Sequence, residues 1–245
     1  TVPPWAEYPG PVSLYAAGGN WFTHGVFGGR DSLIGSLYLV ISEVLDPGEL
    51  ATTFLLQSHQ VLHTVENAGM SQPYYCRHDY VHLKRGEVKP FLKTYYNQFT
   101  ALQDRETYTF WEHYFYASQH KTHEEGWFLM QTRWMLFLEE GDTLSFLRAI
   151  PRRWLEHGKR IVLDRVATYF GPVSLTVESK LAEGTIRAVV TCKGNRRPRT
   201  VAIRVPHPEG QKAAAVTGGV YDAATETVVI PSFKGRAEVV LTFTV

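Results

Sequence analysis

The chemistry of the chain changes near residue 158, and this change constrains the fold more than any other feature. Before it, apolar residues recur at helical spacing; beyond it, apolar and polar residues alternate, as on half-buried strands. Turn residues separate the alternating runs, which begin near Ser174, Thr185, Thr200, Thr227 and Ala237. The pattern predicts an α+β protein in which a helical region, 31–157, precedes an antiparallel β-sandwich over 158–245.

The helical region is predicted to consist of helical hairpins. Prolines and glycines crowd residues 1–30, which we expect to be extended or looped. Asp31 then caps an apolar run, and Asp46-Pro47-Gly48 breaks that run before a second helix, about 49–65. Further helices are predicted over about 77–85, 87–103 and 123–139. The last of them is apolar nearly all round, which predicts burial.

Composition excludes several classes of function. The 25 basic and 24 acidic residues leave a formal charge of +1, so neither nucleic acid nor an anionic membrane is an expected partner. No apolar run approaches the roughly 18 residues of a membrane span. Cys76 and Cys192 lie far apart without metal-type spacing, which favours two unlinked thiols. No motif calls for a cofactor.

The compartment stays open at this stage. No basic-then-apolar leader is visible, and the chain starts at Thr1 without a methionine. The sequence therefore leaves open whether a leader or a whole upstream region is missing. The alternatives are the bacterial cytoplasm and, with such a leader, the periplasm or secretion.

Residues 104–121 are predicted to form a long ordered loop, and acidic, histidine and aromatic residues crowd it and the helix start beyond. Glu112 lies between Trp111 and His113. Apolar walls, here Trp111 and Tyr108, raise the pKa of a carboxyl group through desolvation, and sugar-cleaving enzymes place two carboxyl groups across the scissile bond. The alternative is that Glu112 pairs with His113 or an arginine.

Other polar clusters have simpler interpretations. Glu124 and Glu125 suit the N-terminal end of a helix, whose dipole favours acids. The set His113, His120, His123 and Glu124 lacks a paired ligand motif, so no metal site is predicted. Arg77-His78-Asp79 follows the aromatic pair Tyr74-Tyr75 and forms a second candidate cluster. Gly28-Gly29-Arg30 before Asp31 lacks the P-loop lysine and indicates a helix cap in a tight loop.

The segment Thr107-Tyr-Thr-Phe-Trp-Glu-His-Tyr114, followed by Ser118-Gln-His120 and a helix that carries tryptophan, resembles the six-hairpin glycoside hydrolases, closest to the α-L-rhamnosidase-like group. There the pattern is Thr-Thr-x-Trp-Glu-x-Trp, then Ser-x-Asn-His. The resemblance implies a helical-hairpin (α/α) toroid followed by a β-domain. It also implies inverting hydrolysis with Glu112 as general base. Gln119 and Tyr114 depart from the family pattern, so no particular sugar is implied.

The resemblance also implies that this chain holds only part of the toroid, because the family's general acid lies in earlier hairpins. Asp31 and Asp79, at helix starts on the presumed same rim, are the acid candidates here; a missing hairpin or a partner chain is the alternative. Ala149–Leu155 resembles the family's linker into the β-domain. The substrate-binding candidates are Tyr75, His78, Tyr108, Trp111, His113, Tyr114, His120 and His123.

Two other functions compete with hydrolysis of a polysaccharide or oligosaccharide. One is a non-catalytic carbohydrate-binding subunit that kept the aromatic site and lost the acid. The other is a polysaccharide lyase, whose Tyr/His pair would come from Tyr114, Tyr116, His113 and His120. In every case a partial toroid exposes apolar helix faces, which predicts a homo-oligomer or a partner chain.

Overall fold

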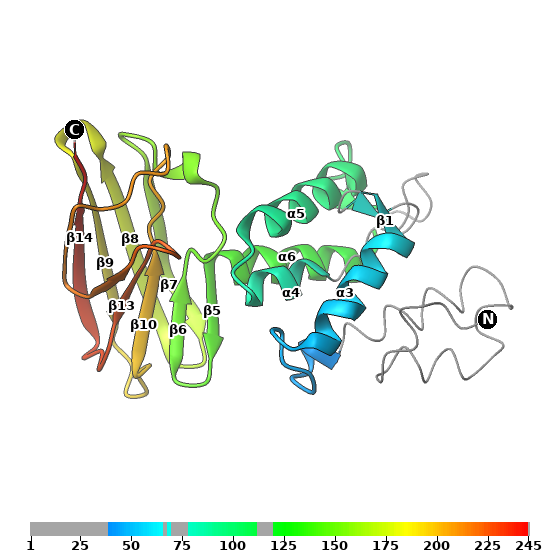
Figure 1. Cartoon of the computed structure of the whole chain (residues 1–245), viewed down its shortest axis with the longest axis horizontal. Coiled ribbons are helices and arrows are strands. Elements are labelled where there is room, and N and C mark those ends of the chain that lie inside the picture. Colours follow the sequence, from blue (N-terminus) through cyan, green and yellow to red (C-terminus); the bar gives the residue numbers. More distant parts are fainter. Residues whose placement is uncertain (1–38, 66–67, 70–77, 112–119, 245) are drawn as a thin grey trace, which may run out of the picture. The chain divides into compact units, whose positions relative to one another are not determined.

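The computed structural model describes residues 39–65, 68–69, 78–111 and 120–244. The chain divides into two compact units, Thr1–Thr132 and Arg133–Val245. Figure 1 shows that the described elements of the first are mainly helices and those of the second mainly strands. The protein is therefore of the α+β class, as predicted.

The first unit contains the predicted helices. Its helices are α3 (Leu50–His63), α4 (His78–Lys84), α5 (Val88–Leu102) and the start of α6 (Thr122–Leu136); residues 39–41 are also helical. Two-residue strands pair as β1 (Thr64–Val65) with β2 (Ala68–Gly69) and as β3 (Gln103–Asp104) with β4 (Thr109–Phe110).

Asp46 produces the predicted break before α3. Its backbone N–H donates to Oε1 of Glu49 at 2.6 Å, while its own Oδ1 accepts from the Gly48 amide at 2.7 Å. The Asp46 carbonyl oxygen accepts from the Thr52 hydroxyl at 2.7 Å. These bonds fix the turn at Asp46–Gly48, and α3 begins just beyond it.

The second unit contains two five-stranded sheets. The first has the order β11-β14-β9-β8-β7 and is antiparallel throughout. Its strands are β7 (Arg160–Thr168), β8 (Gly171–Lys180), β9 (Thr185–Cys192), β11 (Ala215–Thr217) and β14 (Arg236–Thr242). The second sheet has the order β12-β13-β10-β6-β5 and is mixed, because β10 and β6 run parallel. Its strands are β5 (Phe137–Glu140), β6 (Thr143–Phe146), β10 (Thr200–Arg204), β12 (Val220–Asp222) and β13 (Thr227–Ile230).

Strands begin earlier than the sequence pattern predicted. α6 ends at Leu136, and β5 follows at once, so the predicted helix over 123–139 is too long. β6 pairs with β10, more than fifty positions further along the chain. The apolar residues Phe137 and Leu138 suit a helix as well as a strand, and this distant pairing decides between them.

The predicted boundary at 157/158 therefore falls inside the second unit, and so does the predicted linker. Pro151 is followed by the short 3₁₀ helix η3 (Arg152–Leu155), and a second, η4 (Leu181–Glu183), lies between β8 and β9. Leu155 is fully buried, and its carbonyl oxygen accepts from the Ser179 hydroxyl on β8 at 2.8 Å. The segment 149–155 is thus packed into the β-unit.

Alternate side chains on both sheets are buried, which explains why the predicted strands were found. On one sheet the fully buried set includes Leu175, Val177, Ile186, Val190 and Leu241, and on the other Leu144, Val201, Ile203 and Val228. Each such side chain contributes about 1.5–3 kcal/mol through removal from water. Burial of α6, by contrast, is only partial, because Leu129 is 67% exposed and Met130 43% exposed.

Gly218 allows the chain to pass directly from β11 in one sheet to β12 in the other. Its φ is +84°, and a Cβ at this position would lie 1.8 Å from the carbonyl oxygen of Glu238. Any other residue would clash with β14. The two sheets therefore adjoin at these edge strands.

Candidate functional site

A β-hairpin, β3–β4, occupies the first part of the region that was predicted to be irregular. The carboxylate of Asp104 accepts hydrogen bonds from the backbone N–H of Glu106 at 2.9 Å and of Thr107 at 3.3 Å. Its carbonyl oxygen accepts from the Tyr108 amide at 2.9 Å. The bond from the Glu106 amide is the main reason why the pKa of Asp104 lies below its usual value. The ionised carboxylate thus fixes the turn.

Tyr108 projects from this hairpin. Its side chain is 91% exposed, and its backbone has φ +59°, in the left-handed region. The ring therefore stands in solvent at the end of the turn. The predicted aromatic wall of Trp111 and Tyr108 around Glu112 stays a prediction, because Glu112 lies outside the described residues.

The segment that carries Glu112 leaves and rejoins the described structure at this hairpin. Trp111 donates its backbone N–H to the carbonyl oxygen of Leu102 at 2.8 Å, and Lys121 donates to that of Phe110 at 3.2 Å. His120 is exposed with φ +57°, and its charge contributes to the lowered pKa of Asp104. The two ends of the segment are therefore held close together on the hairpin.

Aromatic rings attach the hairpin to the helices. The Phe110 ring centroid lies 5.0 Å from that of Phe128 on α6 and 6.2 Å from that of Phe99 on α5. Phe128 also stacks on Phe99 and Tyr95, at 5.2 and 5.5 Å. Such clusters stabilise beyond the area they bury. These rings pack against one another, so the hydrophobic core accounts for part of the high aromatic content of this region.

Asp79, an acid candidate, lies in the first turn of α4 and is fully buried. Its Oδ2 accepts a hydrogen bond from Nε1 of Trp127 at 3.1 Å. Trp127 stands five positions beyond Thr122, about 7.5 Å along α6 at 1.5 Å per residue. A buried carboxyl group therefore lies beside the part of α6 that follows the Glu112 segment.

His82, one turn after Asp79, has a structural environment. Its Nδ1 lies 2.5 Å from Oε2 of Glu87, just before α5. Burial lowers the pKa of His82, although the contact with Glu87 opposes that effect. Glu124 lies in the first turn of α6, as predicted, and is buried, at 4% exposure.

The structure brings together three of the predicted site residues: Tyr108, Trp111 and His120 on and beside the hairpin. His78 and His123 lie in the first turns of α4 and α6. The other predicted site residues lie outside the described part of the chain; they are Asp31, Tyr75, Glu112, His113 and Tyr114.

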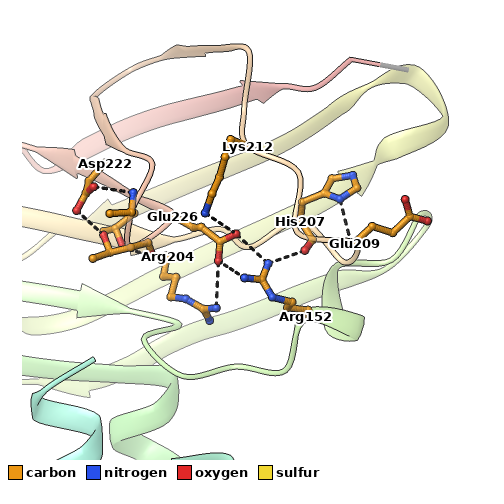
Figure 2. Close-up of polar contacts among 10 residues, drawn as sticks. Arg152, Arg204, His207, Glu209, Lys212, Asp222 and Glu226 are labelled. Atoms are coloured by element: carbon orange, nitrogen blue, oxygen red, sulfur yellow. Dashed lines mark hydrogen bonds and ion pairs between the residues drawn. The ribbon is translucent and has the colours of Figure 1, made fainter. Parts of the chain in front are cut away.

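A separate ionic cluster surrounds Glu226 in the second unit (Figure 2). Arg152 of η3 binds its carboxylate with two hydrogen bonds, at 2.8 and 2.6 Å, and also donates to the His207 carbonyl oxygen at 2.8 Å. Arg204 of β10 and Lys212 approach the same carboxylate at 3.4 Å each. Arg204 also donates to the Ile150 carbonyl oxygen at 3.2 Å. The cluster thus joins η3 to β10 and the β12–β13 turn.

Burial and charged neighbours shift the pKa values of Glu226, Arg204 and His207 in this cluster. Burial alone would raise the pKa of Glu226, but the hydrogen bond and charge of Arg152, with the charges of Lys212 and Arg204, lower it overall. Burial lowers the pKa of Arg204 to about 10, so it stays charged at neutral pH. Burial also lowers the pKa of His207. Glu209 and Asp222 add negative charge nearby (Figure 2), so the cluster stabilises the fold rather than attracting an anion.

Sequence reasoning missed Asp104 and Trp127 at the site and Glu226 in the β-unit. Asp104, followed by Arg-Glu-Thr, has the composition of an Asx turn and was detectable on that ground. The Asp79–Trp127 pair joins two helices far apart in sequence, and the Glu226 partners come from separate segments. Neither arrangement leaves a local signal.

Two properties of the described residues, 39–65, 68–69, 78–111 and 120–244, concern membranes and metal ions. None of the helices within those ranges is long and apolar enough to cross a membrane. Among the same residues, no three histidine, cysteine, aspartate or glutamate side chains lie together where they would hold a metal ion. Cys192 is a free, buried thiol.

No protein-family model matches the chain, and no curated protein matches it either.

Proposed function

We propose that this chain is the carbohydrate-active part of an inverting glycoside hydrolase of the six-hairpin type, with Glu112 as the general base. One observation carries the proposal. The segment that contains Glu112 begins and ends on a fixed hairpin, between a half-buried tryptophan and an exposed histidine, with an exposed tyrosine on the turn. Loops held on a rigid scaffold are where sites are built.

The proposed architecture is a partial α/α toroid followed by a β-sandwich. In support of the toroid, α4 and α5 are consecutive helices joined by a short turn, and α6 contacts both through Trp127 and Phe128. In support of the sandwich, each sheet buries alternate residues, and edge strands of the two sheets are joined at Gly218.

In the proposed mechanism Glu112 takes a proton from the attacking water, and Trp111, Tyr108 and His120 contact the sugar. An inverting site places its second carboxyl group about 6.5–9.5 Å away to leave room for that water. Asp79 is fully buried and bound to Trp127, so it supports α4 and α6 beneath the site. The acid then comes from Asp31, from a further hairpin or from a partner chain.

The buried state of Asp79 favours one competing function, the non-catalytic carbohydrate-binding subunit. Such a protein would keep the aromatic hairpin but lack an acid that reaches the scissile bond. The two proposals differ in turnover and agree in binding, so one variant series separates them.

Glu112→Gln tests the catalytic role. The amide keeps the shape and hydrogen bonding of the side chain but is no base, and general-base catalysis contributes about 10²–10⁴-fold. We expect turnover of aryl glycosides, beginning with p-nitrophenyl α-L-rhamnopyranoside, to fall by about that factor while sugar binding persists. Glu183→Gln, at an exposed carboxylate of η4 in the second unit, is the control and should retain full turnover.

Product analysis completes the test. Inversion predicts that proton NMR detects the anomer opposite to that of the substrate. Unimpaired hydrolysis by Glu112→Gln would remove the catalytic assignment. An unsaturated product absorbing in the ultraviolet would indicate a lyase, and binding without any turnover would indicate the non-catalytic subunit.

A further inference from the structure

Tyr108 has a left-handed backbone at the last position of the turn between β3 and β4. A left-handed backbone costs free energy for any residue with a Cβ, and glycine or asparagine relieves that cost. A tyrosine in this place would be expected to recover the cost by packing, yet 91% of it is exposed. The hairpin therefore holds an aromatic ring in solvent at the expense of stability.

Hydrogen bonds fix the conformation of the turn that carries Tyr108. Three hydrogen bonds converge on Asp104, two at its carboxylate and one, from the Tyr108 amide, at its carbonyl oxygen. The hydroxyls of Thr107 and Thr109 lie 2.8 Å apart on either side of Tyr108. Below them, Phe110 packs against α5 and α6. Asp104 thus fixes the turn, and the rings of the helices fix the hairpin.

Three polar side chains of the same turn are available to bind a carbohydrate beside the ring. Arg105, Glu106 and Thr107 are all exposed on the same turn. An aromatic face accepts the C–H face of a pyranose, while guanidinium, carboxylate and hydroxyl groups bond its hydroxyls.

We infer that the Asp104–Tyr108 turn is a preorganised platform on which one pyranose ring of a polysaccharide chain stacks, with Asp104 as its positioning residue. The inference rests on the proposed carbohydrate function. It adds a sugar-binding contact at Tyr108 that takes no part in the chemical step. Because the turn is already ordered before binding, the protein loses little conformational entropy when the sugar binds.

The test compares Tyr108→Asn with Tyr108→Phe on a printed array of plant and bacterial oligosaccharides, with calorimetric titration of the best array saccharide. Loss of one stacked ring weakens binding by about tenfold. We expect that loss in Tyr108→Asn, with an unchanged or raised melting temperature because asparagine tolerates the left-handed backbone. Tyr108→Phe keeps the ring and should bind as the wild type does. Tyr169→Asn, at another exposed tyrosine, should change nothing.

Asp104 supplies the second arm of the experiment. Asp104→Ala removes both side-chain acceptor contacts and should weaken binding, whereas Asp104→Asn keeps an acceptor oxygen and should restore most of it. Wild-type affinity in Tyr108→Asn, or a lowered melting temperature in that variant, would overturn the inference.

The outcomes also separate this inference from the proposed function. Hydrolysis that depends on Glu112 with binding that ignores Tyr108 would leave the catalytic proposal standing and remove the platform. Binding that depends on Tyr108 without any hydrolysis would do the reverse. A wild-type protein that binds no saccharide on the array contradicts both.

Discussion

Glu226 has a left-handed backbone, with φ +56°, and is 3% exposed, two features that each cost free energy. The cations around Glu226 offset both of these free-energy costs. Arg152 supplies the planar, two-point contact that suits a carboxylate, and Arg204 is itself buried. Removing the negative charge would therefore leave a buried guanidinium without its partner.

Glu226→Gln is expected to destabilise the second unit by about 3 kcal/mol, the typical cost of breaking a buried ion pair by removing one member. Urea unfolding measured by circular dichroism gives the difference in free energy of unfolding. The matched control is Glu238→Gln, whose partner Arg187 forms an equally two-pointed but exposed pair. Exposed pairs contribute little, so the control should be far milder. Equal losses in both variants would count against a structural role for burial.

Acid should remove the contribution of Glu226. Its pKa is lower in the folded protein than in the unfolded chain, so its stabilisation is complete above the unfolded value, about 4.3 for glutamate. It is lost as pH falls through the lower folded value. We expect the stability difference between wild type and Glu226→Gln to be constant from neutral pH to about 5 and to shrink below about 4. Unfolding titrations at each pH would show a constant difference if the charge were irrelevant.

At the scale of elements, the helices and the longer strands followed from sequence because each is set by local pattern. α3 begins after Asp46-Pro47-Gly48, and β8 and β9 alternate over their whole lengths. The short strands β5 and β6 did not follow, because a pattern around Phe137 that suits either helix or strand is decided by pairing with β10. The hairpin β3–β4 was missed for a related reason, since strands of two residues have no period to detect.

The candidate site was likewise predictable only where it depends on local sequence. The candidate segment was singled out from Trp111 and its neighbours, and Tyr108, Trp111 and His120 lie on or next to the β3–β4 hairpin. The Asp104 turn was within reach of sequence reasoning, because its composition is local. The Asp79–Trp127 contact was not, because it depends on how two helices meet.

The position of β5 and β6 leads to a prediction about fragments. A chain of residues 133–245 should fold, whereas residues 158–245 should not, because the shorter fragment lacks β6 and leaves the β10 edge and the apolar residues Val201 and Ile203 without cover. It also lacks Arg152, the main partner of Glu226. Dispersed amide signals in two-dimensional NMR would identify a folded fragment. A well-dispersed spectrum from 158–245 would contradict the importance of the early strands.

At the scale of the whole molecule, the helical unit leaves large apolar side chains exposed. Val44, Leu50 and Leu129 are 67%, 61% and 67% exposed, and Met130 is 43% exposed. The β-unit exposes fewer such residues, chiefly Val162, Tyr169 and Val220. Since a complete toroid would cover its helices with neighbouring hairpins, this contrast is what a partial toroid would show.

We therefore predict that the chain associates in solution, with itself or with hairpins that would complete the proposed toroid. Size-exclusion chromatography with light scattering should give a mass above that of one chain, falling on dilution. Leu129→Lys places a charge at one of these exposed apolar positions and should shift the equilibrium toward the monomer, whereas Val162→Lys, on the edge strand β7 of the second unit, should not. Because Leu129 is 67% exposed, its substitution should affect association more than folding. A monomer at every concentration, with one cooperative thermal transition, would show that the helical unit is complete as it stands.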